Sequence, residues 1–353
     1  MKVKNTNKII IVLGQTSTGK SDFAVEIAKH INGEIISADS RQVYKGMDLG
    51  TGKVPRDKNS SKSKHKKTNT YFYKNVPHHL LDVISPKKVF SVDDFSKQAN
   101  KKIEEILKRP VGHHDSSGAG GKNVPIICGG TGFYIDTLIN QTSLPKVPPN
   151  KKLRKKLYSK SAIALFEYLK KLDPERAKTI DKNNKVRLIR AIEIAKAIGK
   201  VPQIPIRQDL TGTKLDNSKS ATNSAMAEFV ASSNFEVLKI GLTISPEILK
   251  KKIYDRIIIR IKKGMLKEIK NLHDNGVSWK RMHELGLEYR YGALYWQKKL
   301  NKEEMIEKLN TETWHYAKRQ KTWFKRDKDI IWINPLKKSE KLKVIKKVKN
   351  FLK

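Results

Sequence analysis

The sequence predicts an α/β protein: an open parallel sheet with helices on both faces, and a helical, basic lobe inserted into it. Over residues 1–144, short apolar runs alternate with segments of helical periodicity, the pattern of a parallel sheet. Strand signals then stop, lysine and arginine become dense, and strand character returns at Phe235. We therefore expect a core of residues 1–144 and 235–335, an insertion of helices and loop over 145–234, and a basic C-terminal helix or tail over 336–353.

The core is expected to begin with a strand, a loop and a helix. Ile9–Leu13 is a β-branched run that ends at Gly14, as a buried parallel strand does. Ser21–Ile31 carries its apolar residues on one helical face. A second strand is predicted over Glu34–Ser37, and a further strand and turn over Val124–Gly132.

The second half is expected to contain the inserted helices and then to return to the sheet. Apolar residues recur at helical spacing over 145–199, and 203–234 is polar and loop-like. A strand is predicted over 235–243 and a last one over 330–333. Between them, Ser245-Pro246-Glu247 is a good helix start, because a hydroxyl cap precedes proline and an acid. The apolar stripe of that helix consists of Leu249, Ile253, Ile257 and Ile261. Its basic edge consists of Lys252, Arg256, Arg260 and Lys263.

The charge of the chain predicts a polyanionic partner. The 353 residues include 74 Lys and Arg against 35 Asp and Glu, which gives a net charge of +39. Nucleic acid is the first candidate and an anionic membrane surface the second, although lysine-rich codon bias can also contribute. The single cysteine, Cys128, excludes an internal disulfide framework and a cysteine zinc module. No run approaches the ~18 apolar residues of a membrane span, and we expect a cytoplasmic protein.

A phosphate-binding loop follows the first predicted strand. The segment matches G-x-x-x-x-G-K-[ST] in full and consists of Gly14, Gln15, Thr16, Ser17, Thr18, Gly19, Lys20 and Ser21. Its glycines let several N–H groups turn inward, Lys20 supplies a full positive charge, and the Ser21 hydroxyl can hold Mg²⁺. The loop predicts a di- or triphosphate ligand, without saying which.

Asp39 follows the second predicted strand and should lie at the same edge of the sheet as the loop, because parallel strands end together. Its carboxylate could accept a proton from a nucleophile or hold magnesium through water. It could also serve only as a cap or turn residue. Nucleoside kinases place an acid in the same position, so Asp39 by itself does not identify the reaction.

The chain resembles the tRNA dimethylallyltransferases, also called tRNA isopentenyltransferases. The resemblance is carried by the loop, by SADSRQVYKGMDLGTGK (37–53), and by six further blocks in family order, PHHLLDV (77–83), FSVDDF (90–95), PIICGGTGFY (125–134), VRLIRAIE (186–193), EYR (288–290) and AKRQKTWFKR (317–326). It implies a P-loop-type core and transfer of a dimethylallyl group from dimethylallyl diphosphate to the N6 amine of the adenosine 3′ of the anticodon. The partners it implies are the tRNA anticodon stem-loop and the diphosphate, with Mg²⁺ as cofactor. We separately expect a monomer that does not bind membranes.

The resemblance also implies residue roles. Residues 14–21 would bind the diphosphate, and Lys20 and Arg256 would stabilise it as it leaves. Asp39 would be the base, Thr131 would line the reaction channel, and Asp39, Ser40, Arg41 and Gln42 would hold the flipped adenine. The remaining tRNA contacts would be Arg154, Arg187, Arg190 and Arg290.

Three rivals remain. A nucleoside or small-molecule kinase shares the loop and the acid. A prenyltransferase acting on free AMP shares the core, but leaves the basic insertion unused. A non-catalytic RNA-binding protein explains the charge, but not the loop or Asp39.

The chain also departs from the family pattern. Trp314 and Lys252 stand where arginine is usual, and GLEYR (286–290) replaces a shorter Gly-Tyr-Arg. Trp314, Trp323 and Phe324 are interpreted as packing residues rather than base-stacking ones. Metal binding is not expected of His78 and His79, because adjacent residues of a strand face opposite sides.

Overall fold

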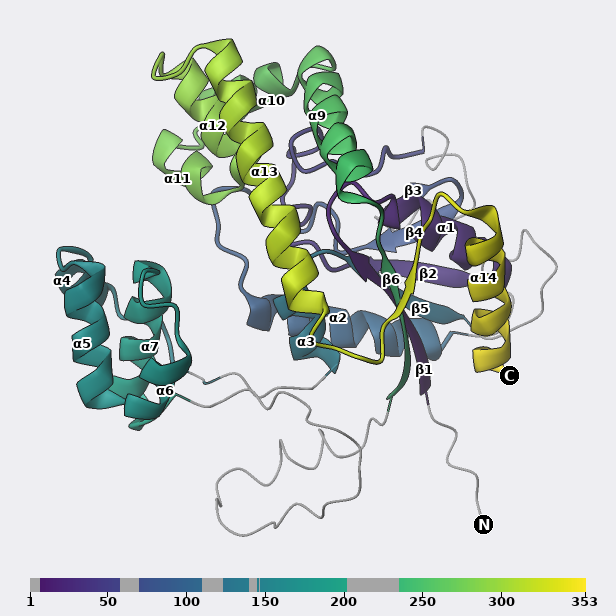
Figure 1. Ribbon diagram of the computed structural model, residues 1–353, viewed down its shortest axis with the longest axis horizontal. Coiled ribbons are helices and arrows are strands. Elements are labelled where there is room, and N and C mark those ends of the chain that lie inside the picture. The colour runs from purple at the N-terminus through teal and green to yellow at the C-terminus, as the bar shows by residue number, and fades with distance from the viewer. Residues whose placement is uncertain (1–6, 58–69, 110–122, 140–144, 146, 202–234) are drawn as a thin grey trace, which may run out of the picture. The chain divides into compact units, whose positions relative to one another are not determined.

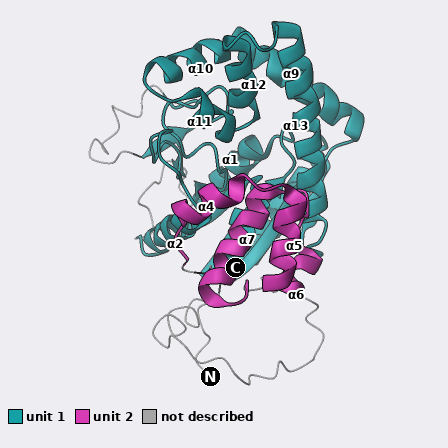
Figure 2. Ribbon diagram, turned by 90° about the vertical axis from the view of Figure 1, so that its left-hand side faces the viewer, with its two compact units in different colours: residues 1–141, 223–353 teal, residues 142–222 magenta. Residues whose placement is uncertain are grey.

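The computed structural model describes residues 7–57, 70–109, 123–139, 145, 147–201 and 235–353. It divides into two compact units, one of residues 1–141 with 223–353 and one of residues 142–222 (Figure 2). The first unit, called the core unit below, contains the sheet and the phosphate-binding loop. The second, called the inserted unit, is helical in its described part.

The core unit is built on one seven-stranded sheet in the order β3-β4-β2-β5-β1-β6-β7. Every neighbouring pair is parallel except β3 with β4. The strands are β1 (Asn7–Gly14), β2 (Gly33–Ser37), β3 (Tyr71–Tyr73), β4 (Val76–His79), β5 (Val124–Gly129), β6 (Phe235–Leu242) and β7 (Ile331–Ile333). The predicted parallel α/β sheet is confirmed, while the β3–β4 hairpin was not predicted.

Helices cover both faces of this sheet (Figure 1). The alternation of side chains along β1 explains why: Ile9 and Ile11 belong to one buried cluster, and Ile10 and Val12 to the other. The first cluster includes residues of α2 (Val92–Leu107) and α3 (Gly132–Ile139), and the second includes residues of α1 (Lys20–Ile31) and α14 (Lys338–Leu352).

Helix α14 is part of the core unit rather than a solvated tail. Its Val344, Ile345 and Val348 are buried in the same cluster as α1. Leu342 of the same helix is 55% exposed, so α14 is buried along one face only. The lysines between these positions stay in water, which explains why the segment reads as basic although it packs on the core.

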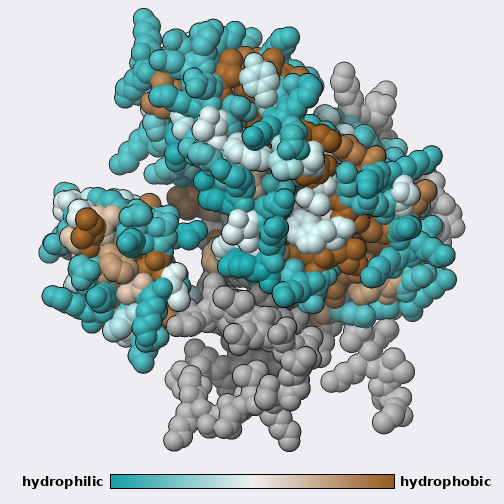
Figure 3. Space-filling view, viewed as in Figure 1, coloured by the Kyte–Doolittle hydropathy of each residue, from teal (hydrophilic) through white to brown (hydrophobic). Residues whose placement is uncertain are grey.

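A second group of helices stands beyond the carboxyl end of β6. They are α9 (Pro246–Lys262), α10 (Met265–Asp274), α11 (Trp279–Glu284), α12 (Leu287–Trp296) and α13 (Lys302–Phe324). As predicted, Ser245 caps α9, accepting from the N–H of Ile248, and Pro246 begins the helix. Figure 3 shows that hydrophilic side chains dominate the surface over these helices. Phe324 is buried and Trp314 and Trp323 are partly buried against the core, which confirms the packing interpretation.

The inserted unit contains α4 (Lys151–Tyr158), α5 (Ala162–Leu172), α6 (Pro174–Thr179) and α7 (Lys185–Ile198). Its own apolar core is formed by one face each of α4, α5 and α7, with Leu157, Leu165 and Leu188 fully buried. The predicted helical character is confirmed within residues 151–198. The predicted loop of 203–234 lies outside the described residues.

Candidate active site

The candidate site lies where three adjacent parallel strands end. β1 runs into the phosphate loop, β2 is followed by Asp39, and β5 is followed by Thr131. Because β2, β5 and β1 are neighbours, their carboxyl ends bring these segments to one edge of the sheet, as predicted. The Ala38 N–H donates to the Cys128 carbonyl at 2.8 Å, so the exit of β2 is joined directly to β5.

The loop is held in a tight curl by its glycines and its own side chains. Gly14 and Gly19 have φ angles of 136° and 87°, which side chains rarely adopt, and a Cβ on Gly14 would lie 2.5 Å from the Leu242 carbonyl oxygen. Inside the curl, the Thr18 hydroxyl and the Lys20 ammonium both donate to the Gln15 carbonyl, at 2.8 and 2.6 Å. The cradle is therefore preformed, with the positive charge of Lys20 folded into it.

Arg256 of α9 extends this cradle from a distant part of the chain. Its guanidinium donates to the Thr16 hydroxyl at 2.8 Å. Burial lowers the pKa of Lys20 to about 8, and the neighbouring charge of Arg256 adds to the effect. Burial, followed by the charge of Arg260, also lowers the pKa of Arg256. Two desolvated cations side by side are costly until an anion joins them, so the site is suited to a highly charged anion.

Two buried polar atoms of the cradle also point to a ligand. Among the described residues, the Ser17 hydroxyl and Nε of Arg256 have no hydrogen-bond partner. Buried polar groups are nearly always paired, by protein or by ligand. Both atoms belong to residues that contact or form the loop, so phosphate oxygens would satisfy them.

Asp39 has one engaged and one available oxygen. Its Oδ1 accepts from the N–H of Arg41 at 2.8 Å and of Gln42 at 3.4 Å. Within the described parts of the chain, Oδ2 accepts no hydrogen bond. One oxygen of the carboxylate therefore caps the turn, and the other is left available to a ligand. The Thr131 hydroxyl accepts from the N–H of Ser40 at 3.2 Å and links this turn to β5.

Gln42 is oriented by its neighbours. The Ser37 hydroxyl donates to its side-chain oxygen at 3.1 Å, and its Nε2 donates to the Gly52 carbonyl at 3.3 Å. Since both ends of the amide are engaged, its flip state is fixed by hydrogen bonding. Ser40, Arg41 and Gln42 follow one another at the same strand end, as predicted, and are partly exposed.

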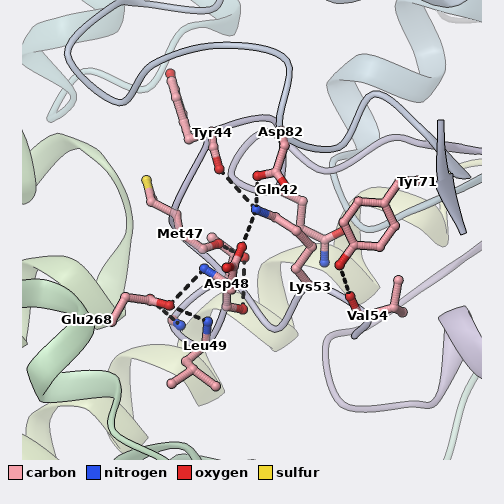
Figure 4. Close-up of polar contacts among 12 residues, drawn as sticks. Gln42, Tyr44, Met47, Asp48, Leu49, Lys53, Val54, Tyr71, Asp82 and Glu268 are labelled. Carbon is pink, nitrogen blue, oxygen red and sulfur yellow. Dashed lines mark hydrogen bonds and ion pairs between the residues drawn. The ribbon is translucent and has the colours of Figure 1, made fainter. Parts of the chain in front are cut away.

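The segment that supports Gln42 is itself tightly anchored (Figure 4). The ammonium of Lys53 donates to the carbonyl of Tyr44 at 3.1 Å and to Asp48 at 2.6 Å, and it also pairs with Asp82. From α10, Glu268 accepts three successive backbone N–H groups of residues 48–50, at 2.8 to 3.1 Å. Neither residue was singled out from the sequence, although Lys53 is the last residue of the family block over 37–53.

The departures from the family pattern have local structural partners. Glu288 of the GLEYR block forms an ion pair with Arg260 at 2.9 Å. Arg260 is therefore buried, and its place on a basic edge of α9 was predicted wrongly. The ammonium groups of Lys250 and Lys318 each lie over the ring of Trp314, 5.1 and 5.8 Å from its centroid.

Helix α13 makes contacts with the loop that the sequence did not predict. The Gln15 side-chain amide donates to the Ala317 carbonyl at 3.1 Å, and the Thr16 N–H donates to Oε1 of Gln320 at 2.7 Å. One turn before Gln320, Tyr316 is surrounded by charged groups of the site: burial raises the pKa of its phenol, and the charge of Asp39 raises it further. The AKRQ block was recognised as a family feature, without a role for these residues.

The arginines predicted to bind tRNA fall into three situations. In the core unit, Arg290 is exposed on α12, and its Nε donates to the His283 carbonyl at 3.1 Å. In the inserted unit, Arg187 is exposed on α7. Arg154 and Arg190 instead meet at Glu193, the first through two bonds of 2.7 Å and the second at 3.4 Å.

The described residues contain no group of three histidine, cysteine or acidic side chains that could hold a metal ion. His79 instead pairs with the buried Glu34 at 2.6 Å, and burial lowers the pKa of His78 to about 4. Ser21 lies in the first turn of α1, as the loop motif requires. In the described ranges, no helix is both long and apolar enough to cross a membrane.

This fold and site define an α/β phosphate-loop protein with an acid opposite its anion cradle. The sequence profile described as IPP transferase matches residues 42–327, and the one described as Isopentenyl transferase matches residues 7–75. The chain belongs to the IPP transferase family and is a prenyltransferase.

Known proteins resemble it along nearly their whole length. It is 36% identical to tRNA dimethylallyltransferase 2 of Treponema denticola over 95% of this chain and 97% of that one. Among solved structures, the tRNA isopentenylpyrophosphate transferase of Bacillus halodurans is 29% identical, with a TM-score of 0.63 over 98% and 97% of the two chains. The tRNA delta(2)-isopentenylpyrophosphate transferase of Staphylococcus epidermidis is 31% identical, with a TM-score of 0.60 over 98% and 99%.

Proposed function

We propose that this chain transfers a dimethylallyl group from dimethylallyl diphosphate to the exocyclic N6 amine of the adenosine 3′-adjacent to the anticodon in tRNA, releasing diphosphate. One observation carries the proposal: the cradle with Lys20 and Arg256 shares a sheet edge with Asp39, whose Oδ2 is available. The relatives named tRNA dimethylallyltransferase add the substrate class, and they do not favour the rival interpretation as a nucleoside kinase.

In the proposed reaction, the N6 lone pair attacks C1 of the dimethylallyl group while the C1–O bond breaks. The electron pair of that bond leaves with the diphosphate. Lys20, Arg256 and the loop N–H groups stabilise the growing negative charge, where preorganised electrostatics contribute most. Asp39 accepts the N6 proton, which becomes acidic as the new C–N bond forms.

Magnesium is proposed as the cofactor. The Ser21 hydroxyl would be its one protein ligand, together with diphosphate oxygens and water, a donor set of hard oxygens that fits Mg²⁺. When bound, the ion would neutralise part of the diphosphate charge. The loop motif supports this proposal, because its last residue stands at the start of α1.

The proposed acceptor is the anticodon stem-loop, with its adenosine turned out of the stack at a cost of roughly a few kcal/mol. Ser40, Arg41 and Gln42 would hold the base, and Arg154, Arg187, Arg190 and Arg290 would bind the RNA backbone. The net charge of +39 supports a nucleic-acid partner. We further propose a cytoplasmic monomer, which the single cysteine and the described internal core support.

Labelled substrates test this function. The protein is incubated with tRNA or AMP as acceptor, and with dimethylallyl diphosphate carrying label in its allyl group or ATP carrying label in its γ-phosphate. We expect label to enter tRNA only from the allylic donor. Transfer of the γ-phosphoryl group to a small acceptor would instead establish a kinase, and transfer of the allyl group to AMP alone would exclude tRNA as the substrate.

A further inference from the structure

Gln320 of α13 joins the two halves of the site. Its Oε1 accepts the Thr16 N–H of the phosphate loop at 2.7 Å, and its Nε2 donates to the Gly130 carbonyl at 2.8 Å. Gly130 precedes Thr131, the residue whose hydroxyl holds the Ser40 N–H beside Asp39. Among the described residues, Gln320 is the one side chain that hydrogen-bonds both to the loop and to the turn of residues 129–131.

The surroundings hold this amide in one place. Gln320 is 6% exposed, and a Cβ on Gly130 would lie 2.3 Å from its Nε2, so a larger residue at position 130 would displace the amide. Thr16 is held from both sides, because its hydroxyl also accepts from Arg256. Because the Thr16 N–H already donates to Gln320, the N–H groups later in the loop are the ones that would donate to the diphosphate.

We infer that Gln320 is a positioning residue that sets the distance between the diphosphate cradle and the adenosine side of the site. The inference rests on the proposed function. An in-line attack needs the amine and the allylic carbon in near contact, and a displacement of about 1 Å can lower the rate about 10²-fold. A rigid amide bridging the two strand ends supplies that alignment without touching either substrate.

Two substitutions separate this role from general stability. Gln320→Met keeps the length of the side chain and removes both hydrogen bonds. Gln320→Asn keeps the amide but shortens the side chain by one methylene, so it cannot reach the loop and the turn together. Gln297→Met is the matched control: it removes a glutamine-to-carbonyl hydrogen bond of 3.1 Å at the C-terminal end of α12, away from the loop.

The measurements are single-turnover transfer to tRNA, the dissociation constants of dimethylallyl diphosphate and of tRNA, and the thermal unfolding of each folded variant. For Gln320→Met and Gln320→Asn we expect transfer rates about 10²-fold below the parent, with both dissociation constants within about threefold of it. Gln297→Met should transfer at the parental rate.

Two results overturn the inference alone, provided the parent transfers label: a Gln320→Asn rate within about threefold of the parent, or a weakened donor affinity with an unchanged rate. The asparagine variant decides the matter if the methionine variant does not fold. A parent that transfers no label at all would overturn the proposed function, and the inference with it.

Discussion

The buried Lys20 makes a pH dependence of donor binding the sharpest test of the cradle. Burial lowers the pKa of its ammonium to about 8 before any anion is bound. A diphosphate next to it favours the charged form and raises that pKa again. The donor should therefore bind to the protonated state, and its affinity should fall as the pH rises through the pKa of the free protein.

The magnitude follows from the fraction of protein that is protonated. With this pKa, Lys20 is charged in about nine-tenths of the free protein at about pH 7 and in about one-tenth at about pH 9. An apparent dissociation constant scales inversely with the competent fraction, so it should rise about tenfold over this range, or about 1.4 kcal/mol. Cys128, the neighbouring thiol, does not interfere, because burial raises its pKa to about 12.

The assay is equilibrium binding of dimethylallyl diphosphate without tRNA, so that no transfer occurs. Lys20→Arg is the control, because a guanidinium stays charged across the range and should give a nearly flat profile. A parental dissociation constant that changes less than about twofold between about pH 7 and about pH 9 would refute the titration of Lys20. An equal rise in the arginine variant would assign the effect to another group.

Three further outcomes are expected. Asp39→Asn keeps the Oδ1 acceptor of its turn and loses the charge, so transfer should fall about 10²- to 10⁴-fold in a single-turnover assay, while tRNA affinity persists; a loss of binding would contradict its role as base. Arg187→Ala should reduce the salt dependence of tRNA binding by about one unit of slope without changing the midpoint of urea unfolding. Arg154→Ala should reduce the salt dependence too, and should also lower the free energy of unfolding in urea by about 1–3 kcal/mol, because it breaks the bonds to Glu193. Equal unfolding midpoints for the two variants would contradict this difference between the two arginines. Glu268→Leu leaves the N–H groups of residues 48–50 unpaired and should lower the free energy of unfolding by about 3 kcal/mol, with Glu268→Gln retaining part of it; a loss below about 1 kcal/mol would show that water replaces the carboxylate.

The central edge of the sheet could be predicted because its signals are local. A β-branched run precedes the loop, two glycines and a lysine-serine pair define the loop within eight positions, and strand ends gather at one edge in any parallel sheet. Asp39 and Thr131 therefore lie where the sequence placed them. The β3–β4 hairpin escaped prediction because three- and four-residue strands carry too few alternating positions to form a pattern.

The contacts of α13 with the cradle were not predicted, because they join distant parts of the chain. Gln15 and Thr16 meet α13 across 302 and 304 positions. Gln320 belongs to a recognised family block, but nothing local in the sequence indicates that its amide reaches the phosphate loop. Arg260 was misassigned for a related reason: its spacing matched a solvated edge, while its partner, Glu288, lies 28 positions away. Periodicity predicts which face a residue shares, but not what another helix brings to that face.

In the inserted unit, a buried carboxylate holds two of the arginines that we propose to bind RNA. Glu193 is 1% exposed at its side chain and holds Arg154 by two parallel bonds and Arg190 by one. A carboxylate on an RNA-binding element would weaken the attraction to phosphate if it stood alone. Shared by two arginines, it leaves a net positive charge and fixes two guanidinium groups that would otherwise lose rotamer freedom on binding. Arg190 is further tied to the Val147 carbonyl at 2.9 Å. Glu193 therefore holds the two arginine side chains in place before any RNA is bound. Their remaining N–H groups are the donors that the proposed contacts with the RNA backbone would use.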